Sequence, residues 1–262
     1  MSGRHLNREP DPAAAAQRAF YDRAYSHVEA EGLRLGAWRQ LSGVGKVDRI
    51  LRLLGGLPDH GVALLDVGCG DGALLVDLAR RRPRWTFAGA EIAPAATALA
   101  ADRLPALDVR TYDGTRLPWP EASFDVGVLS HVLEHVADPA ALLREVARVC
   151  RLVVAEVPLE RNLSARRRSR RTEAARIGHV RRLARRDVRR IVGEAGLELR
   201  DELTATGSRA VLRFFAATPR ARAAADEKWI VRTTLHRLAP SLAERLFTVH
   251  YVAVCGRRAT AT

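Results

Sequence analysis

Apolar residues recur in short runs that alternate with longer stretches of helical sequence. The runs at residues 62–67, 85–90 and 126–129 are largely apolar, as expected of strands buried on both faces. Each run is followed by Ala- and Leu-rich sequence with helical character. This alternation predicts β-α-β units and therefore a parallel sheet.

The alternation continues through the second half of the chain. A helix over residues 139–150 precedes a strand at 152–157, and a helix capped by Asp187 stops at Gly196. Further strands are predicted at 197–203 and 248–255, with helices between them at 221–238 and 241–246. The region 207–246 is therefore expected to be a helical insertion before the last strand.

The N-terminal part has a different pattern from the rest of the chain. Helices are predicted over residues 13–25 and 46–54, and the glycines and proline that follow end the second helix. The predicted organisation is a disordered N-terminus (1–12), a helical cover (13–60) and one α/β domain (61–262), in which residues 159–186 and 207–246 extend over the substrate.

Composition narrows the class of protein. With 262 residues, 47% of them hydrophobic, the chain is long enough to bury a full core. Its three cysteines, Cys69, Cys150 and Cys255, lack the spacing of a zinc site or a disulfide framework. No uncharged apolar stretch approaches the roughly 20 residues of a membrane span. We therefore expect a soluble cytoplasmic protein with no membrane partner.

The positive charge is concentrated in one region. The chain has a net charge of +13. Residues 161–190 account for most of it, because they contain 13 arginines and only two acids, Glu173 and Asp187. Only two of the 43 basic residues are lysine, so part of this signal reflects a preference for arginine over lysine. The region is either a solvated surface or a cationic cover that favours an acidic acceptor, free or bound to an acidic carrier protein.

The stretch LLDVGCGDGALL, residues 64–75, places glycines between a buried strand and a helix. Such a turn lets a ligand approach the backbone closely. Gly68-x-Gly70-x-x-Ala73, with Glu91 further on, also satisfies the looser dinucleotide pattern. Asp66 and Asp71 would repel a pyrophosphate, whereas they suit a ligand with a sulfonium and an ammonium group. The charges therefore favour S-adenosylmethionine over NAD.

Four ordered motifs carry a family resemblance: LDVGCGDG (65–72), FAGAEIAP (87–94), YDGTRLPWPEASFDV (112–126) and SHVLEHVADP (130–139). They resemble the small-molecule branch of the class I S-adenosylmethionine-dependent methyltransferases, and residues 178–199 extend the likeness. The resemblance implies a doubly wound, mostly parallel sheet of seven strands. Residues 1–60 and 205–262 resemble the family only loosely.

The resemblance also implies where the cofactor binds. Glu91 falls where the family binds the ribose hydroxyls, Ile92 where a side chain packs on adenine, and Asp113 where an acid accepts from the adenine amino group. Ser130 falls beside the methionine end. The full set of expected cofactor-binding residues is Asp66, Gly68, Cys69, Gly70, Glu91, Ile92, Asp113, Gly114 and Ser130. We interpret Asp125, which opens a strand, as a structural residue that holds a neighbouring loop.

Methyl transfer needs a nucleophile in line with the sulfonium methyl, and a base if the acceptor is a hydroxyl. His131 and His135 follow the strand predicted at 126–129, which is the fourth strand of the family's sheet, and they are the candidate bases. Glu134 lies between them, but adjacent side chains point apart and no further ligand completes a set, so no metal site is expected.

The sequence therefore predicts transfer of a methyl group to a small molecule, with oxygen favoured over nitrogen or carbon. Methylation of RNA through the arginine-rich region is an alternative, although no aromatic residues for base stacking interleave the arginines. A non-catalytic partner subunit with the same fold is a third possibility. The identity of the acceptor and the oligomeric state stay open.

Overall fold

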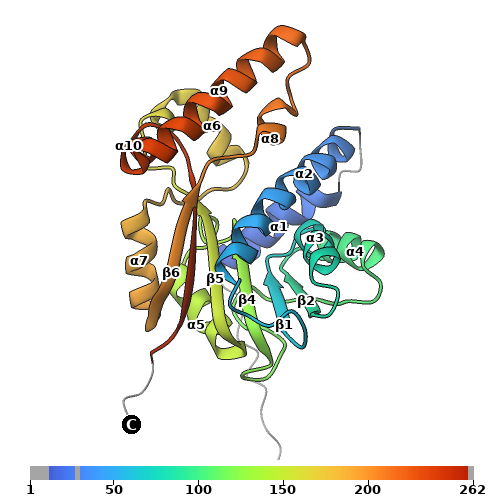
Figure 1. Ribbon diagram of the computed structural model, residues 1–262. Helices are drawn as coiled ribbons and strands as arrows, with labels where there is room; N and C mark the ends of the chain where they lie inside the picture. Colours follow the sequence, from blue (N-terminus) through green and yellow to red (C-terminus); the bar gives the residue numbers. More distant parts are fainter. Residues whose placement is uncertain (1–11, 27–29, 259–262) are drawn as a thin grey trace, which may run out of the picture.

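The computed structural model describes residues 12–26 and 30–258. Seven strands form one sheet in the order β3-β2-β1-β4-β5-β7-β6, in which only β7 runs antiparallel to its neighbours (Figure 1). This arrangement confirms the predicted fold. The strands are β1 (Ala63–Val67), β2 (Thr86–Glu91), β3 (Asp108–Thr111), β4 (Phe124–Ser130), β5 (Cys150–Pro158), β6 (Leu197–Ala205) and β7 (His250–Arg257).

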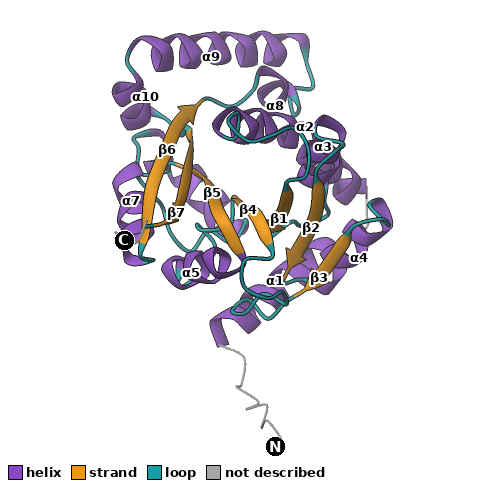
Figure 2. Cartoon of the chain, turned by 60° about the horizontal axis from the view of Figure 1, so that its bottom comes forward, coloured by secondary structure: helices purple, strands orange, loops and turns teal. Residues whose placement is uncertain are grey.

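Helices cover both faces of the sheet (Figure 2). Within the described residues they are α1 (Pro12–Ser26), α2 (Ala30–Leu53), α3 (Ala73–Arg81), α4 (Pro94–Arg103), α5 (Pro139–Val149), the 3-10 turn η1 (Ser164–Arg166), α6 (Arg168–Arg176), α7 (Arg185–Glu194), α8 (Arg209–Arg213), α9 (Pro219–Leu238) and α10 (Pro240–Leu246). Helices α2 and α3 pack on one face, and α5 and α7 on the other. Helices α6, α8, α9 and α10 lie together beyond one end of the sheet (Figure 1).

The central strand β4 shows why the sheet is buried on both sides. Val126 and Val128 belong to the apolar cluster under α2 and α3, whereas Leu129 belongs to the cluster under α5 and α7. Gly127 permits the close approach of α5, because a Cβ atom there would lie 2.6 Å from Val146 Cγ1. The near-continuous apolar runs of the sequence are the consequence of this two-sided burial.

Several elements differ from the prediction. Helix α2 begins at Ala30, well before residue 46, and β3 and α8 were not predicted as elements. The arginine-rich region forms η1 and α6. Asp187 is the third residue of α7, and its Oδ2 accepts a hydrogen bond from Ala184 N at 2.8 Å, so it caps the helix from inside its first turn. The predicted disorder of residues 1–12 falls almost entirely outside the described residues.

The three cysteines are buried and form no disulfide with one another. None of the helices in the described ranges is long and apolar enough to cross a lipid bilayer.

Candidate active site

A cavity of about 980 Å³ lies at the carboxyl ends of β1, β2 and β4. The strand ends and the turns that follow them form its floor. Helices α1 and α2 and residues 207–215 form much of its wall, and Ile177 and His179 from the arginine-rich region complete it. The parallel topology explains the position, since ligands of such sheets bind where the strands end.

The glycine turn after β1 has the backbone conformation that its sequence predicts. Gly68, Gly70 and Gly72 have φ values of +77°, +55° and +76°, a region that other residues rarely adopt. A Cβ atom on Gly68 would lie 2.6 Å from Val132 Cγ2, and one on Gly70 would lie 2.5 Å from the Tyr25 hydroxyl. Gly68, Cys69 and Gly70 line the cavity, and the two glycines let Val132 and Tyr25 pack directly against the turn.

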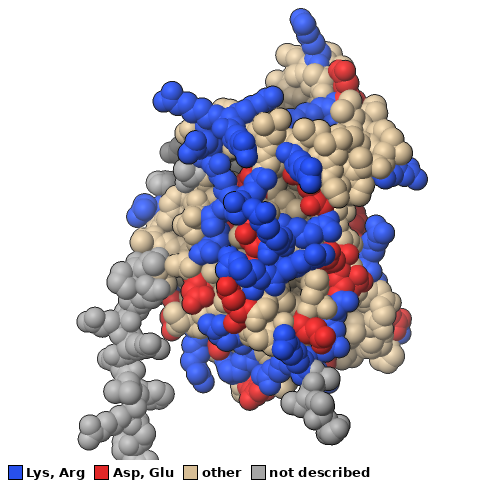
Figure 3. Space-filling view, turned by 90° about the vertical axis from the view of Figure 1, so that its left-hand side faces the viewer, with Lys and Arg blue, Asp and Glu red and all other residues tan. Residues whose placement is uncertain are grey.

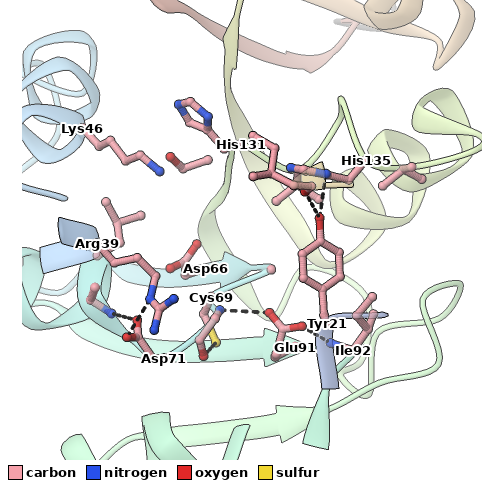
Figure 4. A pocket seen from close by; sticks show the side chains of 18 of the residues that line it. Tyr21, Arg39, Lys46, Asp66, Cys69, Asp71, Glu91, Ile92, His131 and His135 are labelled. Carbon is pink, nitrogen blue, oxygen red and sulfur yellow. Dashed lines mark hydrogen bonds and ion pairs between the residues drawn. The ribbon is translucent and has the colours of Figure 1, made fainter. Parts of the chain in front are cut away.

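Glu91 ends β2 beside this turn and is only 6% exposed. Its Oε2 accepts a hydrogen bond from Gly70 N at 2.9 Å, and its Oε1 accepts from Ile92 N at 2.7 Å and Ala93 N at 3.0 Å (Figure 4). Burial raises the pKa of the carboxyl group, and the three amides oppose that rise. The bonds fix the carboxylate at the cavity wall with lone pairs left for a ligand hydroxyl.

Asp66 lies at the end of β1 and is 2% exposed. Burial raises its pKa to about 7, although Lys46 on α2 acts in the opposite direction. Burial also lowers the pKa of Lys46. Figure 4 shows the Lys46 side chain pointing from α2 toward Asp66 and His131. A group that titrates near neutrality therefore faces the cavity.

Asp71, which was expected to be an unpaired anion, is bound to two arginines. Its carboxylate forms ion pairs with Arg39 of α2 at 3.0 Å and Arg103 of α4 at 3.2 Å. Both partners are distant in sequence, and Arg39 itself lines the cavity. The expectation that Asp71 repels an anionic ligand is therefore wrong, because the two guanidinium groups neutralise it. The electrostatic case against a dinucleotide rests on Asp66 alone.

The structure separates the remaining predicted cofactor residues. Ile92, Gly114 and Ser130 line the cavity, whereas Asp113 is exposed and does not. Asp113 Oδ1 accepts hydrogen bonds from Thr115 and from Arg116 N, which lower the pKa of this carboxyl group against the effect of partial burial. Contact of Asp113 with a ligand stays a prediction. Asp125 Oδ2 accepts from Ala63 N at 3.0 Å, which confirms its structural role.

His131 and His135 both line the cavity but belong to different hydrogen-bond networks. His131 Nε2 lies 3.2 Å from His250 Nδ1. His135 Nδ1 lies 2.6 Å from the Tyr21 hydroxyl and 3.0 Å from Gly178 O (Figure 4). Burial lowers the pKa of both imidazoles, so both are neutral, and able to accept a proton, at neutral pH.

His131 also has an unusual backbone. Its φ is +60°, and among described residues other than glycine only Ala122, at +53°, also has a positive φ. A left-handed conformation costs an ordinary residue about 1–2 kcal/mol. At the end of β4 it turns the chain sharply out of the strand, where the imidazole reaches the cavity.

Behind His131 and His250 lies a buried ion pair that the sequence analysis did not identify. Arg49 of α2 donates from Nε to Glu156 Oε1 at 2.8 Å, and Ser130 Oγ donates to Glu156 Oε2 at 3.0 Å. Glu156 is fully buried in the middle of β5. Burial alone would raise the pKa of Glu156, but Arg49, His131 and His250 lower it to about 2. The pair ties α2 to the sheet directly under the cavity.

Two groups of described side chains have the composition of a metal site, His131 with Glu156 and His250, and Glu134 with His135 and His179. In the first group Arg49 is already bound to Glu156 and would repel a cation. In the second group both Glu134 oxygens are buried without a hydrogen-bond partner, although Oε1 lies 3.2 Å from His131 Nδ1. The fold brings His179, which the sequence did not indicate, to Glu134 and His135, and the absence of a metal site stays a prediction.

The arginine-rich region does not place its described arginines in the cavity. Only Ile177 and His179 of this region line it, whereas the lining arginines, Arg39 and Arg49, come from α2. That this region covers a bound acceptor stays a prediction.

Sequence reasoning missed several polar residues that line the cavity, among them Tyr21, Lys46, Arg49, His179 and His250. It also missed Glu156, which lies buried behind the cavity. Two of them carried a signal: Glu156 is an acid inside an apolar run, and Lys46 is one of only two lysines. The others become neighbours only through tertiary packing.

Residues 65–152 match the family model described as a methyltransferase domain. Among similar proteins, a nocamycin O-methyltransferase of Saccharothrix syringae is 41% identical over 100 residues, which are 36% of each chain. A ubiquinone biosynthesis O-methyltransferase of Sodalis glossinidius is 32% identical over 159 residues, 55% of this chain and 60% of that protein. The chain thus spans between about a third and three fifths of these curated relatives.

Among solved structures, the geranyl diphosphate C-methyltransferase of Streptomyces coelicolor A3(2) matches with a TM-score of 0.63 and 13% identity, over 96% of this chain and 100% of that one. At this identity the likeness concerns the fold. Residues 65–152 thus match a methyltransferase domain, and the sheet order is the one that the resemblance to the class I S-adenosylmethionine-dependent methyltransferases implied.

Proposed function

We propose that this protein binds S-adenosylmethionine in the cavity and transfers its methyl group to a hydroxyl group of a small molecule. The observation that carries the proposal is that one cavity joins the glycine turn, Asp66 and Glu91 to a group of neutral histidines. The names of the O-methyltransferase relatives support oxygen as the acceptor atom.

The size of the cavity supports two ligands. Pockets for one drug-sized ligand measure about 300–1,000 Å³, and this one lies at the top of that range. Glu91 would bind the ribose hydroxyls and Asp66 the methionine ammonium. Phe20, Tyr21, Val211 and Phe215 also line the cavity, and the acceptor would lie against side chains of this kind.

The chain's own groups would handle the proton of the acceptor hydroxyl. An imidazole near the end of β4 takes that proton as the oxygen attacks the methyl carbon, and the sulfonium leaves as a neutral thioether. We assign this role to His131, because it lines the cavity directly after Ser130. Its Nε2 lies 3.2 Å from His250 Nδ1 and its Nδ1 lies 3.2 Å from Glu134 Oε1, so one of these contacts gives way when the imidazole takes the proton. Glu156 would favour the charged imidazolium, whereas Lys46 and Arg49 oppose it.

A transfer assay tests the function. The protein is incubated with S-adenosylmethionine labelled in the methyl group and with fractionated small molecules or total RNA. The proposal expects label in a small-molecule fraction, on a methyl group that nuclear magnetic resonance identifies as bound to oxygen. Label in RNA alone would favour the RNA alternative and overturn the proposal.

Affinity for S-adenosylhomocysteine should depend on pH through Asp66. Because burial holds the pKa of this carboxyl group at about 7, the charge that binds the ligand ammonium is lost as the pH falls below that value. Affinity should weaken about tenfold per pH unit below neutrality. Calorimetry at several pH values measures this slope. Asp66→Asn should bind weakly with a flatter profile, and an unchanged slope would exclude Asp66 as the titrating group.

Glu91→Gln should weaken S-adenosylhomocysteine binding roughly 10- to 100-fold, since hydrogen bonds to a charged group contribute about 1.5–3 kcal/mol. Gln keeps one oxygen, which can accept from the amides of Ile92 and Ala93 but not also from Gly70 N. Circular dichroism and thermal unfolding therefore check that the variant is folded. Asp125→Asn, at a structural acid outside the cavity, is the matched control. Equal affinities of all three proteins would remove Glu91 from the cofactor site.

A further inference from the structure

A second hollow of about 750 Å³ lies apart from the cavity, on the face that carries α7 and α10. Figure 3 looks onto this side of the molecule and shows basic side chains gathered over its middle, outnumbering the acidic ones. Six arginines and two acids, Glu160 and Glu244, line this hollow, which we call the arginine hollow. Both acids have partners, His179 for Glu160 and Arg185 for Glu244. The arginines are Arg161, Arg166, Arg182, Arg185, Arg186 and Arg189.

Half of these arginines have no acidic partner. Arg161 pairs with Asp187, Arg185 with Glu202 and Glu244, and Arg189 with Glu202. In contrast, Arg182 donates only to Ala165 O at 3.4 Å, and Arg166 and Arg186 form no ion pair with any described residue. The Nε atom of Arg185 is buried without an acceptor. A ligand with several anionic groups would pair with the three arginines that have no acidic partner among the described residues.

The surroundings of the hollow indicate the kind of ligand. Leu163 is 60% exposed beside Arg161, and its amide donates to Arg245 O of α10 at 2.8 Å. Leu242, on the same helix α10, is 46% exposed. Leucines contribute nothing to binding a free phosphate, and single-stranded nucleic acid is bound by aromatic residues instead. Exposed leucines beside unpaired arginines fit an amphipathic segment of another protein.

We propose that the arginine hollow and the adjacent Leu163 and Leu242 form a docking surface for an acidic amphipathic helix of a partner protein. Carboxylates of the helix would enter the hollow and pair with Arg166, Arg182 and Arg186, and its apolar face would cover the two leucines. This surface does not depend on the proposed methyl transfer. It does adjoin the cavity, because Glu160 of the hollow accepts from His179, which lines the cavity, at 2.8 Å.

The test uses a fluorescein-labelled helical peptide of about 16 residues, four to five turns, with Glu on one face and Leu on the other. Fluorescence anisotropy should show saturable binding to the full chain that weakens with salt. The triple variant Arg166→Glu, Arg182→Glu, Arg186→Glu should bind about tenfold more weakly, since three exposed ion pairs are lost and reversed. If circular dichroism shows that it does not fold, the corresponding Gln triple replaces it.

A second triple variant controls for net charge. Arg52→Glu, Arg200→Glu and Arg220→Glu change exposed arginines on α2, β6 and α9; Arg200 matches Arg182 in donating to a backbone carbonyl. This variant should bind the peptide like the parent. Equal weakening by both triples would overturn the proposal, since only overall charge would then matter. Undiminished binding of a peptide with Ser in place of Leu, or tighter binding of single-stranded poly(U) through the same arginines, would also overturn it.

Discussion

Replacing His131 by asparagine should lower kcat about 10²- to 10⁴-fold, the range that a general base contributes. Asparagine is chosen because it tolerates the left-handed backbone that His131 adopts at φ +60°. It removes the proton acceptor without adding backbone strain. Affinity for S-adenosylhomocysteine should stay within a few-fold of the parent, because the glycine turn and Glu91 are untouched.

The measurement is single-turnover methyl transfer to the acceptor identified by labelling, across a range of pH. The parent rate should fall on the acid side as the imidazole gains a proton, at a pH below the ordinary histidine value, since burial lowers the pKa of His131. The variant should lose that limb. His135→Asn is the comparison: if it abolishes transfer while His131→Asn does not, the base is His135 and our assignment is wrong.

Replacing Arg49 by methionine should lower the free energy of unfolding by about 3–5 kcal/mol, the usual cost of leaving one charge of a buried pair alone. Glu156 would then lie fully buried beside Ser130 with no guanidinium. The double variant Arg49→Met with Glu156→Gln should recover much of the loss, because it removes the isolated charge. Urea unfolding followed by circular dichroism measures both values.

The sign of the pH effect provides a further check on the same pair. Because the pKa of Glu156 is lowered from 4.5 to about 2 in the folded protein, its contribution is complete above the unfolded value and is lost as the pH falls toward 2. The stability difference between the parent and Arg49→Met should therefore shrink between about pH 5 and pH 2. A difference that is constant over this window would mean that the ion pair is not its source.

The features that sequence alone predicted are local ones. The glycines at 68, 70 and 72, the strand that precedes them and the acid that ends the next strand depend on neighbours within a few residues, and each lies where it was expected. The sheet follows from the alternation of apolar runs with helices. Helix α2 was predicted too short because its first half, from Ala30, has Gly32 and Gly36, which disfavour a helix in isolation.

The features that sequence could not predict depend on distant packing. Asp71 was expected to be an unpaired anion, but helices α2 and α4 bring Arg39 and Arg103 to it. His179 reaches His135 and Glu134 from a region that was expected to form an arginine cover. His250 reaches His131 because β7 inserts beside β5 as the antiparallel strand. None of these partners could be placed without the order of strands and the length of the insertion.

Calorimetric titration with S-adenosylhomocysteine tests the central claim, that the cavity at the ends of β1, β2 and β4 is the cofactor site. We expect one saturable site in the parent. The double variant Asp66→Asn with Glu91→Gln should lose affinity by at least about 100-fold, because two groups that form charge-assisted hydrogen bonds are lost. Absence of binding to the folded parent, or equal affinity of the parent and the double variant, would contradict it.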